Sequence, residues 1–210
     1  MAQPPHTMQL AGRADWALMI AIHDALRRDL DQLLHTAASH ASARARWGTF
    51  RSQLRFHLAA EHAAMWPRAE AALAGDPHGQ ALLDAMDDER QLLGPLQVMI
   101  DDAFAVDADP GRLRQLLARL RTRLASHLAH EEADALPLIS QVLSPRELGR
   151  IAAAIRGGHS TRRARTTIPW ALAGASPDIR EHALNQLPAP ARLLYRTVWL
   201  PRHARTTPPL

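Results

Sequence analysis

The residues with the clearest capacity for chemistry are two pairs of histidine and glutamate, each pair spaced by four residues. His57 precedes Glu61 in the segment HLAAEHAAMWP, and His127 precedes Glu131 in the related segment HLAHEEADALP. Residues four apart lie one above the other on a helix face, so each pair would present an imidazole and a carboxylate in one direction. This ligand set suits iron, manganese or zinc. The repeat therefore predicts a metal site, and its symmetry favours a bridged pair of ions.

Both pairs fall on stripes of helical spacing that are otherwise apolar. A carboxylate buried there without a partner costs several kcal/mol, and a bound cation would compensate for it. His23 lies on a similar stripe, 34 residues before His57 and in phase with the repeat. It is therefore a fifth candidate ligand. Arg90 lies 37 residues before His127 and so takes the corresponding place in the second half.

Helices must position these side chains, because apolar residues recur at spacings of three and four in four long segments. The segments span about residues 15–38, 42–74, 78–104 and 111–142. Pro67 and Pro95 fall inside this pattern and predict a kink or break in the second and third helices. Long helices with short connections predict an all-α, up-down-up-down four-helix bundle over residues 11–143.

The character of the chain changes after Ser144 and Pro145. Residues 144–210 hold 11 Arg against three acidic residues and are interrupted by prolines. We expect a basic C-terminal extension of short helices packed on the acidic bundle. The arginines match no recognisable nucleic-acid module, so nucleic acid is not the expected partner.

Composition limits the compartment and the chemistry. The chain has no Cys, which excludes disulfides, thiolate ligands and a cysteine nucleophile. Its start lacks the pattern of a signal peptide, and no apolar run approaches the roughly 20 residues that span a bilayer. We expect a soluble, cytoplasmic protein with no membrane span.

With these motifs the sequence resembles the hemerythrin-like (HHE cation-binding) domain family. The matching pieces are IHDALRRDL in the first helix, FHLAAE followed by MWP in the second, and SHLAHEE followed by LPL in the fourth. The resemblance covers about residues 15–143. The tail, with IPWALAGASPD and LPAPARLLYRTVW, is similar to the extension on some actinobacterial members. The resemblance implies a non-haem metal centre of two iron ions, or another divalent metal, bridged by the two glutamates and held by His23, His57, Glu61, His127 and Glu131.

The third helix departs from the family pattern, because Arg90 stands where a histidine is expected. A guanidinium only donates hydrogen bonds and cannot bind a metal. Three outcomes stay open. Asp87, on nearly the same face, could lend a carboxylate to a second ion. One ion could be held with an open position. Arg90 could instead replace the metal and form an ion-pair cluster with Glu61 and Glu131.

The resemblance implies a protein that binds, senses or processes a small molecule such as O₂, NO or peroxide, or that handles iron. The sequence assigns no catalytic residue and does not decide whether the protein is an enzyme. The alternative is a metal-free helical interaction module in which Arg90 neutralises a degenerate site. The sequence does not indicate an oligomeric state.

Overall fold

The computed structural model describes residues 16–36, 40–106, 109–158 and 161–206, and within these ranges the chain is helical, with no strand. The described residues separate into two compact units, residues 26–143 and a second unit that joins residues up to Ala25 with 144–210. Helix α1 runs through that division without interruption. The elements from α1 to the end of the bundle are α1 Ala17–Thr36, α2 His40–Ala64, α3 Trp66–Ala72, α4 Pro77–Gln91, α5 Leu93–Ala105, α6 Pro110–His130, the π-helical η2 Glu131–Ala135, and α7 Leu136–Val142.

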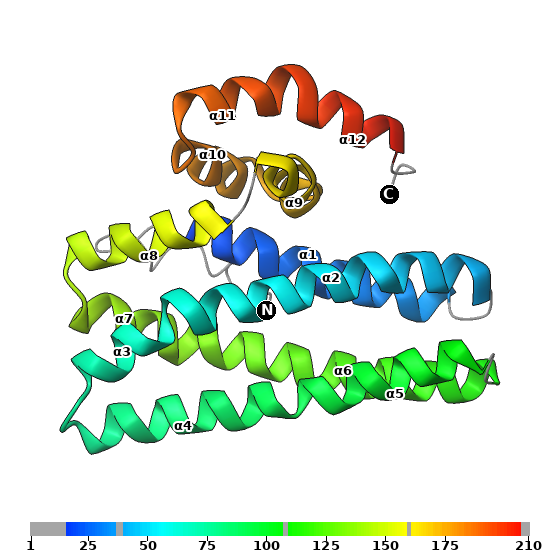
Figure 1. The fold of residues 1–210 in the computed structure, drawn as a ribbon, viewed down its shortest axis with the longest axis horizontal. Coiled ribbons are helices and arrows are strands. Elements are labelled where there is room, and N and C mark those ends of the chain that lie inside the picture. Colours follow the sequence, from blue (N-terminus) through cyan, green and yellow to red (C-terminus); the bar gives the residue numbers. More distant parts are fainter. Residues whose placement is uncertain (1–15, 37–39, 107–108, 159–160, 207–210) are drawn as a thin grey trace, which may run out of the picture. The chain divides into compact units, whose positions relative to one another are not determined.

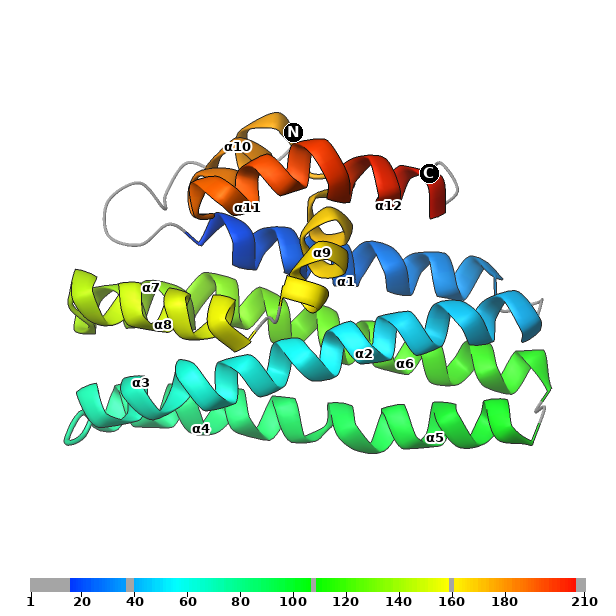
Figure 2. The ribbon, with the colours of Figure 1, turned by 45° about the horizontal axis from the view of Figure 1, so that its top comes forward.

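These elements form the predicted all-α, up-down-up-down four-helix bundle. The second, third and fourth helices are each built from shorter pieces that continue one another, and they run side by side in both views (Figures 1 and 2). Helix α3 contacts α4 and α7, and α5 packs along α6. None of the described helices is long and apolar enough to cross a bilayer.

Capped turns reverse the chain between the long helices. Gly75 takes a positive φ of 91°, a conformation that costs glycine little. The Asp76 carboxylate then accepts a hydrogen bond from the His78 amide, and Pro77 opens α4. The same Asp-Pro arrangement starts α6, where Asp109 accepts from the amide of Arg112. Helix starts are thus specified by local residues.

Prolines determine where the long helices are interrupted, as predicted for Pro67 and Pro95. Helix α2 ends before Met65, two residues ahead of Pro67, and α4 gives way to α5 at Leu92, three residues ahead of Pro95. Pro137 has a related effect that the sequence did not predict. Because Pro137 has no N–H to continue the helical ladder, the turn before it widens, and the Leu136 amide donates to the carbonyl of Glu131.

The bundle core follows the stripes that the spacing predicted. Its largest fully buried side chains are Leu26, Leu30, Leu33, Phe50, Leu54, Met65, Met86, Leu93, Ile100, Leu113, Leu117 and Leu120. The spacings of four in the first, second and fourth helices place these residues on one face of each helix. Polar groups on the same faces are therefore held among apolar side chains.

A charged cluster ties α2 to α5 near one end of the bundle. Trp47 Nε1 donates to Oδ1 of Asp101 at 2.7 Å, and Arg51 pairs with the other carboxylate oxygen. Burial alone would raise the pKa of Asp101, but the hydrogen bonds from Arg51 and Trp47 outweigh it and lower the pKa. The ionised carboxylate is therefore the form that stabilises this contact.

Replacing Asp101→Asn is expected to lower the free energy of unfolding by about 1 kcal/mol at pH 7. Hydrogen bonds to charged groups contribute more than this when buried, but Asp101 is one-third exposed and partly screened. Because its folded pKa is depressed, the stabilisation is present above about pH 4 and is lost as the pH falls through the folded pKa. Urea titrations at pH 7 and in acid measure both effects. The neighbouring exposed Asp102→Asn is the control, and an equal loss in both variants would contradict the assignment.

The second unit contains the predicted short helices broken by prolines. They are α8 Pro145–Gly158, α9 Thr161–Leu172, α10 Pro177–Asn185, α11 Ala189–Leu194, the π-helical η3 Tyr195–Trp199 and α12 Leu200–Thr206. Trp170, Tyr195 and Trp199 are buried. The segment η3 stands two residues before Pro201, just as η2 stands before Pro137. The boundary predicted between residues 143 and 144, and the packing of the extension on the bundle, stay predictions.

Candidate metal centre

The HxxxE pair of the second helix is held on the buried face of α2. His57 and Glu61 are 5% and 1% exposed. Leu54, three residues before the histidine, and Met65, four residues after the glutamate, are fully buried on the same face. One turn of helix separates the imidazole from the carboxylate, and His57 Nε2 lies 2.9 Å from Oε1 of Glu61. The sequence pattern therefore places both groups in the core with their polar atoms close together.

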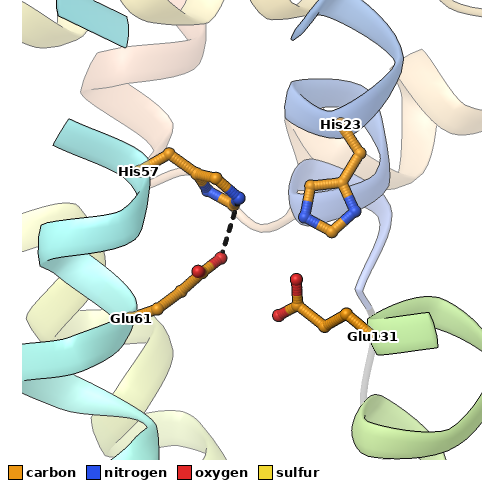
Figure 3. Close-up of side chains that lie close together, drawn as sticks. All are labelled: His23, His57, Glu61 and Glu131. Atoms are coloured by element: carbon orange, nitrogen blue, oxygen red, sulfur yellow. Dashed lines mark ion pairs between the residues drawn. The ribbon is translucent and has the colours of Figure 1, made fainter. Parts of the chain in front are cut away.

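Two further side chains complete a cluster with this pair. His23 of α1 and Glu131, the first residue of η2, are both fully buried. One nitrogen or oxygen atom of each of His23, His57, Glu61 and Glu131 lies within 4.8 Å of the corresponding atom of the other three. Figure 3 shows the four side chains pointing toward one another from three helical segments. The structure thus brings together four of the five predicted ligands.

Burial strongly affects the charge state of these groups. Desolvation raises the pKa of Glu61 well above its usual range, although the charge of Arg90 opposes the shift. Desolvation also raises the pKa of Glu131, and the nearby charges of Glu61 and Glu132 raise it further, against the opposing effect of Arg27. Burial lowers the pKa of His57 to about 3, so its imidazole is neutral and keeps a lone pair for a ligand bond.

This donor set fits a metal ion. Among the described residues, neither carboxylate oxygen of Glu61 accepts a hydrogen bond, and its Oε1 lies 2.9 Å from Nε2 of the neutral His57. Desolvation raises the pKa of both carboxylates and the charge of Glu61 further raises the pKa of Glu131. A cation between the two groups would remove this penalty. Two imidazoles and two carboxylates can supply four ligand bonds to ions such as iron, manganese or zinc.

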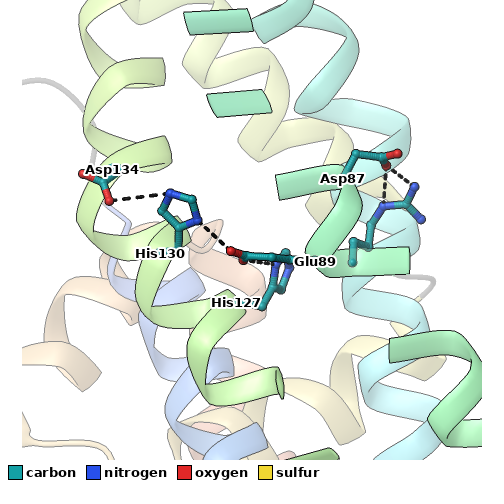
Figure 4. A network of polar contacts seen from close by, with 6 residues as sticks. Asp87, Glu89, His127, His130 and Asp134 are labelled. Carbon is teal, nitrogen blue, oxygen red and sulfur yellow. Dashed lines mark hydrogen bonds and ion pairs between the residues drawn. The ribbon is translucent and has the colours of Figure 1, made fainter. Parts of the chain in front are cut away.

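The fifth predicted ligand, His127, is also buried but meets a different partner. It is 1% exposed on α6, and its Nδ1 lies 3.4 Å from Oε2 of Glu89 on α4. It is not part of the group of four. Glu89 also bonds His130, whose Nδ1 lies 3.0 Å from Oε1 of the same carboxylate (Figure 4). Glu89 and His130 are both half-buried in this contact.

Arg90 does not lie between the two central glutamates. Its side chain is 28% exposed and donates through Nε, at 3.1 Å, and through a terminal nitrogen to Oδ1 of Asp87, three residues earlier on α4. Asp87 is itself about half exposed and accepts a further hydrogen bond from Gln91. The expectations that Arg90 fills the site, or that Asp87 supplies the missing ligand, are therefore wrong. The charge of Arg90 reaches the site only through its effect on the pKa of Glu61.

The sequence was also compared with families of known proteins. The family model described as Hemerythrin HHE cation binding domain matches residues 15–139. The chain belongs to this family. No curated protein and no solved structure compared with the chain matches it.

The hemerythrin match covers all five predicted ligands and ends before the basic extension. The likeness of the tail to actinobacterial members therefore stays a prediction.

Within the hemerythrin domain, the polar residue that sequence reasoning missed is Glu89. Its spacing gave a usable signal, since Glu89 follows Met86 by three residues and precedes Leu93 by four, and both of these are buried. The prediction singled out Arg90 instead because it lies 37 residues before His127, in the place that corresponds to His23 in the first half.

Proposed function

We propose that this protein holds a non-haem metal centre of two iron ions with His23, His57, Glu61, His127 and Glu131 as ligands. The observation that supports it most is the convergence of four buried imidazole and carboxylate groups within 4.8 Å in a hemerythrin HHE domain. In this proposal each imidazole would bind one ion, and the carboxylates of Glu61 and Glu131 would be shared between the two ions. The same donor atoms can also bind manganese or zinc, so the choice of iron rests on the family match.

The small-molecule ligand is O₂, NO or peroxide in this proposal. When bound, the ions supply redox and Lewis-acid chemistry to such a ligand. The chain supplies the enclosure, because the residues that flank the ligands on their stripes are apolar and buried. They include Leu54, Met65, Leu124, Leu128 and Ala135. An apolar enclosure of this kind keeps bulk water out and favours the binding of a small, uncharged molecule.

The metal-free alternative predicted from the sequence places the guanidinium of Arg90 between the two glutamates in place of a metal ion. Arg90 is instead part-exposed and bonded to Asp87. Arg27, whose charge lowers the pKa of Glu131, pairs with Glu132 at 2.9 Å. Neither pairing places a guanidinium against both Glu61 and Glu131, so the cluster is better matched to a bound ion.

Binding of the small molecule is tested on anaerobically prepared protein loaded with ferrous iron. Separate additions of NO, O₂ and peroxide are expected to change the optical and electron paramagnetic resonance spectra in proportion to bound iron. Metal-free protein treated in the same way is the control for reaction of the polypeptide. Spectra that stay unchanged with all three reagents, while the iron stays bound, would contradict a small-molecule function and leave metal storage or a structural role.

A further inference from the structure

The third helix has no histidine ligand, and the structure shows which side chain occupies the corresponding place. We propose that Glu89 supplies the ligand of α4 to the second metal ion, opposite His127. The inference rests on the proposed metal centre and adds a residue to it. It also replaces the two earlier candidates on this helix, Asp87 and Arg90, which bond each other away from the core.

The position of Glu89 on its helix supports this role. Met86 and Leu93 on either side of it are 2% and 0% exposed, so the Glu89 stem leaves α4 on the buried face. Helix α4 contacts both α6 and η2, the segments that carry His127 and Glu131. Arg90 is one residue further along, about 100° around the helix, and its guanidinium bonds the half-exposed Asp87. Glu89 is thus the α4 side chain directed at the metal-binding histidine of the fourth helix.

The two oxygens of Glu89 have different surroundings. Oε1 lies 3.0 Å from His130 Nδ1, a normal hydrogen-bond distance. Oε2 is buried and has no hydrogen bond among the described residues, although it faces His127 Nδ1 at 3.4 Å. That distance is long for a hydrogen bond between these groups. It matches two donor atoms that share one ion, because metal bonds of about 2.1 Å at tetrahedral angles separate the donors by about 3.4 Å.

His130 acts as a positioning residue in this arrangement. It holds Oε1 of Glu89 through Nδ1, while its Nε2 lies 3.8 Å from the exposed carboxylate of Asp134 on the same helical segment (Figure 4). A carboxylate fixed through one oxygen loses little further freedom when the other binds an ion, and such supporting contacts raise metal affinity. The segment HLAHEEAD therefore contains one proposed ligand, His127, and also His130, which supports the proposed ligand Glu89 on another helix.

The two ions then have unequal donor sets. The first has two imidazoles, His23 and His57, together with the bridging glutamates. The second has one imidazole, His127, and the additional carboxylate of Glu89. Carboxylate oxygens favour harder ions such as manganese, whereas imidazole suits iron and zinc. We expect two distinguishable binding steps in a metal titration of the full-length protein, with the second weaker for zinc.

The test compares Glu89→Gln with Glu89→His in the full chain, using metal content after dialysis and iron titration as readouts. The amide of Gln keeps the size and hydrogen bonding of the side chain but binds metal poorly. We expect Glu89→Gln to hold one ion per chain, with at least a tenfold loss of affinity in the second step. Glu89→His, which brings back an imidazole, is expected to keep both ions. The adjacent exposed residue provides the matched control, Asp88→Asn, which should behave like the wild type.

The outcomes separate this inference from the proposed function. If Glu89→Gln keeps both ions at wild-type affinity, Glu89 only orients His127 and the inference is overturned while the metal centre stands. A wild type that binds a single ion overturns the inference and also the two-ion form of the proposed function, and leaves a centre of one ion. A wild type that binds no metal overturns both. Should Glu89→Gln fail to fold, Glu89→Ala takes its place, and a folded, helical Glu89→Ala protein that keeps both ions at wild-type affinity would contradict a ligand role.

Discussion

His57→Ala is expected to lower the affinity of the first metal ion more than about 100-fold, beyond the 10- to 100-fold loss typical of groups that only orient a ligand. In the proposed centre, the neutral imidazole of His57 would supply one of the few ligand bonds at a buried position, 2.9 Å from the carboxylate of Glu61. Neither water nor a neighbouring side chain replaces it easily, because Leu54 and Met65 enclose this face of α2. Metal content after dialysis and competition with a chelator measure the loss.

His62→Ala is the matched control for this variant. His62 belongs to the same segment, HLAAEHAAMWP, but it is exposed on the other side of α2. It should bind metal as the wild type does. Equal losses in the two variants would indicate a general effect on the helix, and no loss in either would remove His57 from the ligand set.

Glu61→Gln has the second-largest expected effect. Whether it raises or lowers the free energy of unfolding relative to the wild type depends on whether metal is bound. Removing metal from the wild type leaves two carboxylates buried together, with the pKa of each raised mainly by desolvation. The amide keeps the shape of the side chain and has no charge to desolvate. In metal-free protein we therefore expect Glu61→Gln to be at least as stable as the wild type.

With metal bound, we expect the wild type to be more stable than Glu61→Gln. An ion present at about 1,000 times its dissociation constant adds about 4 kcal/mol to the stability of the wild type. For a chain of this length that raises the melting temperature by about 10 °C. The variant, which lacks one bridging carboxylate, should gain little. Thermal unfolding with and without metal measures both comparisons, and Glu70→Gln on the exposed face of α3 is the control. A metal-free Glu61→Gln protein far less stable than the wild type would contradict the account of desolvation.

The bundle and most of the candidate metal centre could be predicted from residue spacing. His57, Glu61 and Glu131 stand in phase with leucines and other apolar residues, so any helix that buries the stripe also buries them. Pro67 and Pro95 predicted interruptions in the second and third helices, and both helices are interrupted just before these residues. Local sequence determines these features, which is why they could be predicted from a single sequence.

The third helix shows where spacing stops being sufficient. With 3.6 residues per turn, residues three and four positions after Met86 both lie near the stripe, so Glu89 and Arg90 compete for the inward direction. The bond between Arg90 and Asp87 resolves the choice, and it depends on side-chain conformations that spacing does not specify. The π-helical turn at Glu131 was missed for a similar reason. A proline predicts an interruption but does not specify whether the helix breaks or widens.

The most direct test of the metal centre is elemental analysis of the full-length protein purified without chelators and after reloading with ferrous iron. We expect about two iron ions per chain, held through dialysis by ligands of the imidazole and carboxylate type. A correctly folded helical protein that retains no transition metal, before or after reloading, would show that the buried histidines and glutamates stabilise one another without an ion.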